Sequence, residues 1–175
     1  MHRTISSLLF LLAATPAIAA DTPDPFGLSL GDSCDQVQSM RAETQGASTI
    51  TGGPVYQVDV APINFDGLLA LSVVCSEARA VAAVIAHFEK EFGGATFDRL
   101  RKMLQDNYTL DRLDEAHVGN QQADFSHNNV RILLEEPHMS RRTSVTYMTD
   151  AFDRQFQQYQ REEAREKERQ EAGQL

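Results

Sequence analysis

The pattern of apolar and polar residues changes period several times along the chain, and each change indicates an element of secondary structure. Alternation with a period of two, or a short apolar run, is typical of strands. An Asp-Gly pair at Asp66-Gly67, of the kind favoured in hairpin turns, separates two of these segments. The pattern predicts a short strand over residues 26–30 and further strands over residues 55–62, 68–75, 121–125, 130–135 and 143–149.

Apolar residues at helical spacing predict helices over residues 33–43, 77–92, 97–107 and from residue 150 onward. In the second segment, Val81, Ile85 and Phe88 recur at this spacing, and Gly93 is placed to end the helix. In the last segment, only the first half carries apolar residues that could dock on a domain. Residues 160–175 are expected to form a charged, polar helical tail.

Short turns between successive strands imply a mainly antiparallel sheet with helices packed on it, which is an α+β fold. The expected order is (short β)-α-β-β-α-α-β-β-β-α, with about five strands in the sheet. We expect a linker over residues 21–25, where Pro23 and Pro25 oppose regular pairing, and a single domain over residues 26–159. No repeat longer than these units is apparent.

The first twenty residues have the composition of a cleavable signal peptide. Arg3 precedes an apolar run that is shorter than a membrane span, and Ala17-Ile18-Ala19 supplies the small residues of a cleavage site near Ala19 or Ala20. We therefore expect a periplasmic or secreted protein without stable membrane insertion. Its partner would be another envelope or extracellular protein.

The charge of the chain argues against nucleic acid as a partner. The formal charge is −9, and removal of residues 1–20 leaves 15 basic and 25 acidic residues and a charge of −10. A surface of this sign repels phosphate backbones.

The chain has two cysteines, Cys34 and Cys75, which are 41 positions apart. In an oxidising compartment a pair of this kind is most simply a disulfide. Two free or buried thiols are the alternative. The wide spacing excludes a Cys-x-x-Cys redox motif.

Gly31-Asp32-Ser33 can be interpreted in two ways. Ser33 followed three positions later by Gln36 predicts a capping box at the start of a helix. The same residues also resemble the opening block of the GDSL-type esterases, in which a Ser at this position attacks an ester and a later Asp-x-x-His completes the site. That resemblance would make Ser33 the nucleophile and His117, in Asp114-Glu115-Ala116-His117, its base. Cys34 stands where that family has Leu, and the family's Gly-x-Asn-Asp block is absent.

Other kinds of site have no motif in this sequence. His127, His138 and the neighbouring Glu135 and Glu136 do not have a metal-ligand spacing. The Thr51-Gly52-Gly53-Pro54 segment lacks the Lys and Ser/Thr of a phosphate-binding loop. We therefore predict no catalytic, cofactor or metal site.

Residues 27–37, Gly27-Leu28-Ser29-Leu30-Gly31-Asp32-Ser33-x-x-Gln36-Val37, resemble a short pattern of small bacterial envelope proteins. The pattern is similar to that of the SmpA/OmlA-type domain of outer-membrane assembly lipoproteins and of the related β-lactamase-inhibitor-like fold. This resemblance implies helices set against a small antiparallel sheet and a function in protein–protein contact. The chain lacks the lipidated Cys of the former group.

The sequence thus favours a non-catalytic, exported, protein-binding or envelope-associated module. One alternative is a serine esterase that uses Ser33 and His117. Another is a structural or oligomerising role for the C-terminal helix.

Overall fold

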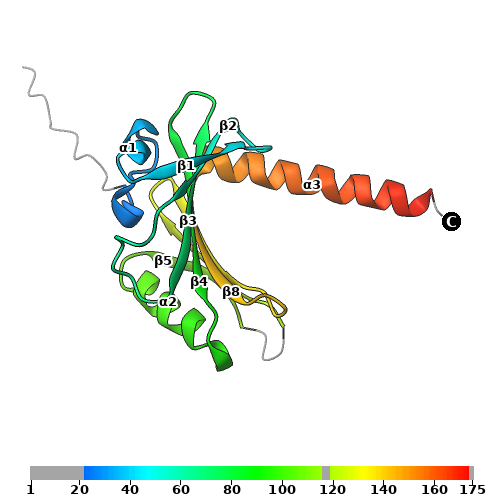
Figure 1. The fold of residues 1–175 in the computed structure, drawn as a ribbon. Helices are drawn as coiled ribbons and strands as arrows, with labels where there is room; N and C mark the ends of the chain where they lie inside the picture. The colour runs from blue at the N-terminus through cyan, green and yellow to red at the C-terminus, as the bar shows by residue number, and fades with distance from the viewer. Residues whose placement is uncertain (1–21, 116–118, 174–175) are drawn as a thin grey trace, which may run out of the picture.

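The computed structural model describes residues 22–115 and 119–173, so the predicted signal peptide lies outside the described residues (Figure 1). Its helical elements are η1 (Pro25–Gly27), α1 (Asp35–Gln38), η2 (Phe92–Gly94), α2 (Ala95–Gln105) and α3 (Asp150–Ala172). Its strands are β1 (Ala42–Ala47), β2 (Gly52–Val58), β3 (Leu68–Ser76), β4 (Val81–Glu89), β5 (Thr109–Glu115), β6 (Gln121–His127), β7 (Val130–Glu136) and β8 (Arg142–Thr149).

The eight strands form one antiparallel sheet in the order β1-β2-β3-β4-β8-β7-β6-β5. The two central strands, β4 and β8, come from distant parts of the chain and pair from Ala83 with Met148 to Glu89 with Arg142. Each is the last strand of a four-stranded meander. The sheet is therefore built from two meanders joined through their final strands.

Each meander follows a helix, so the chain repeats one topology: α1 with β1 to β4, and then α2 with β5 to β8. The sequences that open the two halves correspond at Gly31 and Gly94, Ser33 and Thr96, Asp35 and Asp98, Val37 and Leu100, and Met40 and Met103. Both glycines have positive φ angles, +88° and +79°, which glycine adopts without steric cost. The chain therefore does contain a repeat longer than single strands and helices, contrary to the expectation. Five matching positions within ten residues are too weak a signal to reveal this repeat before the strand order is known.

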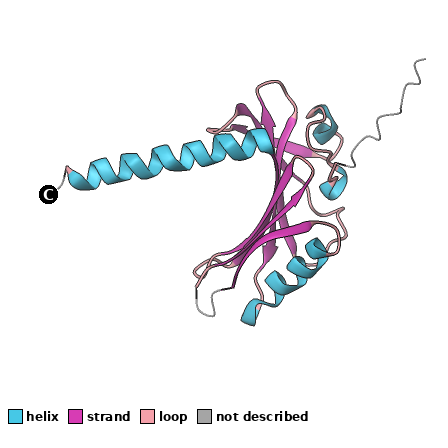
Figure 2. Cartoon of the chain, turned by 180° about the vertical axis from the view of Figure 1, so that it is seen from behind, coloured by secondary structure: helices cyan, strands magenta, loops and turns pink. Residues whose placement is uncertain are grey.

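The helices divide between the two faces of the sheet, which curves so that α3 leaves from its concave side (Figures 1 and 2). On the convex face, α2 and the N-terminal segment cover the larger core, which includes Leu28, Val37, Val84, Phe97 and Phe125. On the concave side of the sheet, Phe152 and Phe156 at the start of α3 cover a smaller cluster that includes Val74, Ala83 and Met148. The rest of α3 extends away from the domain.

The expected five-strand arrangement was wrong, because the described residues form eight strands, although helices still pack on an antiparallel sheet. The largest error concerns residues 77–92, which form strand β4 instead of a helix. Both faces of this central strand are buried, so apolar residues occupy almost every position and also match helical spacing. Its β-branched residues, Val81, Val84 and Ile85, are the signal that favours a strand.

Three further expectations at the ends and edges were wrong. The helix expected over residues 33–43 is the single turn α1, and residues 42–47 form the edge strand β1. Strand β5, the other edge, lies where no strand was expected. Residues 26–30 contain the end of η1 and no strand. Both edge strands are exposed at most positions, so they carry no alternation of apolar residues that would reveal them.

The other elements are confirmed within a few residues. These are α2, the strands β2, β3, β6, β7 and β8, and the start of α3 at Asp150. Strands β2 and β3 pair as a hairpin, but β2 ends at Val58, so the connection is nine residues long instead of the five expected over residues 63–67. Their register is fixed by residues on the convex face, where Tyr56 faces Val73 and Val58 faces Leu71.

Candidate functional site

The structure separates Ser33 from the described part of its expected partner motif. Ser33 forms a single bridge with Ala80 beside the β3–β4 turn, whereas Asp114 lies on β5 at an edge of the sheet. Strands β8, β7 and β6 lie between β4 and β5. His117 lies outside the described residues. The Asp114 carboxylate is paired with Arg112, at 3.4 Å.

The predicted capping box is replaced by other contacts of the same side chains. The Ser33 hydroxyl accepts a hydrogen bond from the Asp35 N–H at 3.2 Å, two residues on rather than three. Gln36 donates its side-chain N–H to the Ser29 carbonyl at 3.3 Å instead of reaching back to Ser33. Residues 31–35 form a turn, and the Asp35 carboxylate at its end also pairs with the Arg79 guanidinium at 2.9 Å. Gly31-Asp32-Ser33 therefore serves to fasten the N-terminal segment to the β3–β4 turn.

The disulfide Cys34–Cys75 is confirmed. It joins the N-cap of α1 to strand β3, with 6.3 Å between the Cα atoms, and both cysteines are fully buried. It therefore fixes the helical turn α1 against the convex face of the sheet.

Among the described residues, no group of three or more His, Cys, Asp or Glu side chains could hold a metal ion. His127 and His138 lie at the ends of different strands, on β6 and after β7. In the described part of the chain, no helix is long and apolar enough to cross a membrane.

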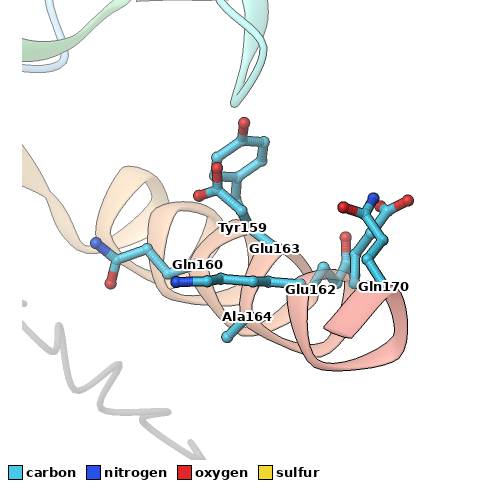
Figure 3. Close-up of a pocket in the computed structure, with 8 residues that line it drawn as sticks. Tyr159, Gln160, Glu162, Glu163, Ala164 and Gln170 are labelled. Carbon is cyan, nitrogen blue, oxygen red and sulfur yellow. The ribbon is translucent and has the colours of Figure 1, made fainter. Parts of the chain in front are cut away.

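Two hollows in the surface offer little to a ligand. One lies on the outer half of α3 and is lined by Tyr159, Glu162, Glu163 and other residues of that single helix (Figure 3). A single helix cannot enclose a ligand. The other, of about 620 Å³, lies at the start of α2, where its charged residues already pair with one another. Arg101 pairs with Asp98 at 3.2 Å, and Lys90 pairs with the buried Glu136 at 3.5 Å.

Beyond the start of α3, no helix lies on the concave side of the sheet in the described structure, and we call this uncovered part the concave face (Figures 1 and 2). In its central row, His87 on β4, Ser144 on β8, Glu135 on β7 and Gln122 on β6 are lateral neighbours. All four side chains are half-buried. These polar residues follow directly on the apolar residues beneath α3.

The order of this row does not suit nucleophilic catalysis. Ser144 lies between His87 and Glu135, whereas a catalytic triad needs the imidazole between the hydroxyl and the carboxylate. No hydrogen bond joins these three side chains in the described structure. The order of the row therefore does not place an imidazole between the Ser144 hydroxyl and the Glu135 carboxylate.

Charges on the concave face are mixed with an acidic excess. By strand register, the face carries five acidic residues and three arginines: Glu43, Glu89, Asp114, Asp124, Glu135, Arg112, Arg131 and Arg142. Arg131 is at its border, where the guanidinium binds Asp124 and also Asp153 of α3, at 2.7 Å. This pair of contacts fixes the start of α3 to the sheet.

Partial burial changes the titration of two residues of the central row. Burial raises the pKa of Glu135, and nearby Asp124 raises it further, while Arg131 opposes the shift. Burial lowers the pKa of His87, and Arg142 lowers it further. The fold therefore favours the neutral form of both side chains. Displacing water from this face is easier for neutral groups than for charged ones.

Glu135→Gln should increase the free energy of unfolding at pH 7. Below about pH 4.3 the carboxyl is protonated in the folded and unfolded states, so the variant gains nothing there. As the pH rises through the raised folded pKa of Glu135, ionisation costs the wild type a stability that the variant keeps. Solvent screening limits the gain to roughly 0.5 kcal/mol. Urea unfolding at several pH values measures it.

Glu168→Gln, on the exposed outer half of α3, is the matched control and should show no comparable pH-dependent gain. An equal effect of both substitutions, or a gain for Glu135→Gln that persists at pH 3, would contradict this interpretation of the concave face.

Comparison of the chain with protein families, with curated proteins and with solved structures gave no match.

Sequence reasoning missed the concave face as a surface. Ser144 and Glu135 lie in segments that were predicted as strands, but His87 lies in the segment predicted as a helix. The alternation of polar residues along β7 and β8 is a sequence signal for a solvated face. The strand order that brings β4 beside β8 has no counterpart in the local sequence.

Proposed function

We propose that this chain is an exported, non-catalytic binding module whose concave face holds a basic surface of another envelope or extracellular protein. The observation that carries the proposal is that α3 leaves the concave face uncovered. A curved sheet face with half-buried polar side chains can follow the surface of a folded partner and offer it hydrogen bonds. The acidic excess of the face favours a partner of opposite charge, and Glu135 contributes less to it than the other carboxylates because the fold favours its neutral form.

Two other features support the exported part of the proposal. The buried Cys34–Cys75 disulfide is typical of proteins from oxidising compartments. The composition of residues 1–20 fits a signal peptide. The similarity of residues 27–37 to envelope domains points in the same direction.

The long helix α3 is less suited to hold a partner. After Phe156 and Tyr159 it has no apolar stripe, and its outer half is exposed at every described position. Charged pairs such as Lys167 with Glu171, at 3.9 Å, keep it helical in water. Helices associate stably through sustained apolar positions, which this segment lacks.

Site-specific crosslinking in the cells that make the protein tests the proposal. A photo-crosslinking residue at Ser144, in the centre of the concave face, should capture a defined partner, whereas the same residue at Gln160 on α3 should not. Charge reversal by Glu135→Lys should reduce the captured fraction at least tenfold, because it places a cation against a basic surface.

Glu168→Lys makes the same change of charge on the outer half of α3 and is the control for nonspecific attraction. Equal capture from Ser144 and Gln160, or capture that Glu135→Lys and Glu168→Lys reduce alike, would show that the concave face is only a solvated surface.

A further inference from the structure

A cavity of about 160 Å³ lies on the convex face of the sheet, where the two halves of the chain meet. Phe88 of β4 and Val145 and Tyr147 of β8 form its floor. Helix α2 contributes one wall through Leu100 and Leu104. This position is on the opposite side of the sheet from the concave face, so the cavity is independent of the proposed partner surface.

Aromatic rings form another part of the lining of the cavity and continue into the floor. Phe26 packs edge-on against Phe65, with 5.8 Å between ring centroids and an interplanar angle of 62°. Phe65 in turn packs against Phe88 at 5.3 Å. Tyr108 and Tyr147 make a second edge-on pair at 6.2 Å. Rings at these angles present both edges and faces, which is the arrangement that another aromatic ring prefers.

Phe26 is placed in this wall by an unusual backbone conformation. Its φ angle is +59°, in the left-handed region that bulky side chains rarely adopt. Gly27, with a φ of +77°, continues the turn. Such a conformation persists only where the surroundings hold it, and residues of this kind occur frequently at ligand sites.

The cavity also has a polar side and an open rim. Burial raises the pKa of Tyr147, and Tyr108 raises it further, because both disfavour the charged phenolate. Met103, whose side chain is 44% exposed, and Asn107 lie at the rim. A flexible thioether at the mouth of a pocket adapts readily to the group that enters.

From these contacts we infer that the cavity binds a single aromatic ring, either a free small molecule or a side chain of a polypeptide. A cavity of about 150 Å³ lined by apolar side chains is known to hold benzene, so the volume suits a ring system of roughly six to nine atoms. The edges of the surrounding rings select a flat π-system over an aliphatic chain of equal size.

Titration with indole tests the inference, because the chain contains no tryptophan and the fluorescence of the probe can be observed alone. We expect saturable binding with a Kd of about 0.1–1 mM, typical of a ligand of this size. Val145→Phe, which fills the cavity from its floor, should weaken binding at least tenfold. Leu69→Phe, at a residue that is 45% exposed outside the cavity, should leave the Kd unchanged.

Met103→Phe is a second variant for the case that Val145→Phe disturbs folding. Met103 lies at the exposed rim, so a larger ring at this position closes the mouth of the cavity without strain in the core. Circular dichroism and urea unfolding identify any variant that fails to fold. A blocked Ala-Trp-Ala peptide distinguishes the two sources of the ring. If the peptide binds more tightly than indole, the ligand is a polypeptide side chain; if it binds more weakly, the ligand is a free small molecule.

Three results would overturn the inference. These are the absence of saturable binding by both probes, a Kd that Val145→Phe and Met103→Phe both leave unchanged, and displacement of bound indole by 1-hexanol with an inhibition constant no higher than the Kd of indole. The last result would mean that the cavity does not select aromatic rings.

Discussion

Replacement of Cys34 and Cys75 by alanine should lower the free energy of unfolding by about 4 kcal/mol. The disulfide closes a loop of 41 positions, and in the chain-entropy model a loop of this length restricts the unfolded chain by about that amount. Both cysteines are fully buried, so the loss of their sulfur atoms adds to the effect. Urea unfolding of the oxidised wild type and of the double variant measures the difference.

Reduction of the wild type provides the control for packing. Reduced wild type keeps both sulfur atoms, so its loss reports the crosslink alone, and the double variant should be insensitive to the reductant. If the wild type unfolds at the same urea concentration with and without reductant, the disulfide does not stabilise this fold.

Arg131→Met should cost roughly 2–4 kcal/mol, because it leaves the Asp124 carboxylate without its guanidinium. Asp124 is only 6% exposed, and its other described contact is a 3.0 Å hydrogen bond from Gln122. The same substitution removes the 2.7 Å contact between Arg131 and Asp153 that fixes α3. Arg131→Lys should recover only part of the loss, since one ammonium cannot replace the planar guanidinium that binds both carboxylates.

A double-mutant cycle separates the buried charge from the attachment of α3. Adding Asp124→Asn to Arg131→Met should restore stability, because a neutral amide costs less to bury than a carboxylate. Asp153→Asn alone should cost no more than about 1 kcal/mol, as expected for a pair near the surface. Strictly additive losses for Arg131→Met and Asp124→Asn would mean that the two side chains do not act together.

Local pattern was sufficient for elements with one buried face. Helix α2 and the strands β6, β7 and β8 carry most of their apolar residues on one face, although Leu133 of β7 and Met148 of β8 are buried on the other, and all were predicted within two residues at their start. The pattern failed for β4, which is buried on both faces, and for β1 and β5, which are largely exposed. The spacing of apolar residues cannot reveal a strand whose two faces have the same surroundings, because its residues then do not alternate between apolar and polar.

The disulfide could be predicted because it depends on compartment and residue count rather than on fold. The concave face and the aromatic cavity could not, since both depend on the pairing of β4 with β8. The cavity brings together Phe26, Phe65 and Tyr147, which lie 39 and 82 positions apart in sequence. No local signal in the sequence indicates that these three side chains lie close together in the fold.

The pairing of β4 with β8 also has a consequence for the rate of folding. Within each meander, neighbouring strands are close in sequence and can pair by local search, whereas the central pair joins residues as distant as Ala83 and Met148. Non-local pairing of this kind slows folding, because a long segment must be closed before its contacts form. The Cys34–Cys75 disulfide lies wholly within the first half, so it does not shorten that search. Oxidation should therefore stabilise the first half without accelerating the joining of the two halves.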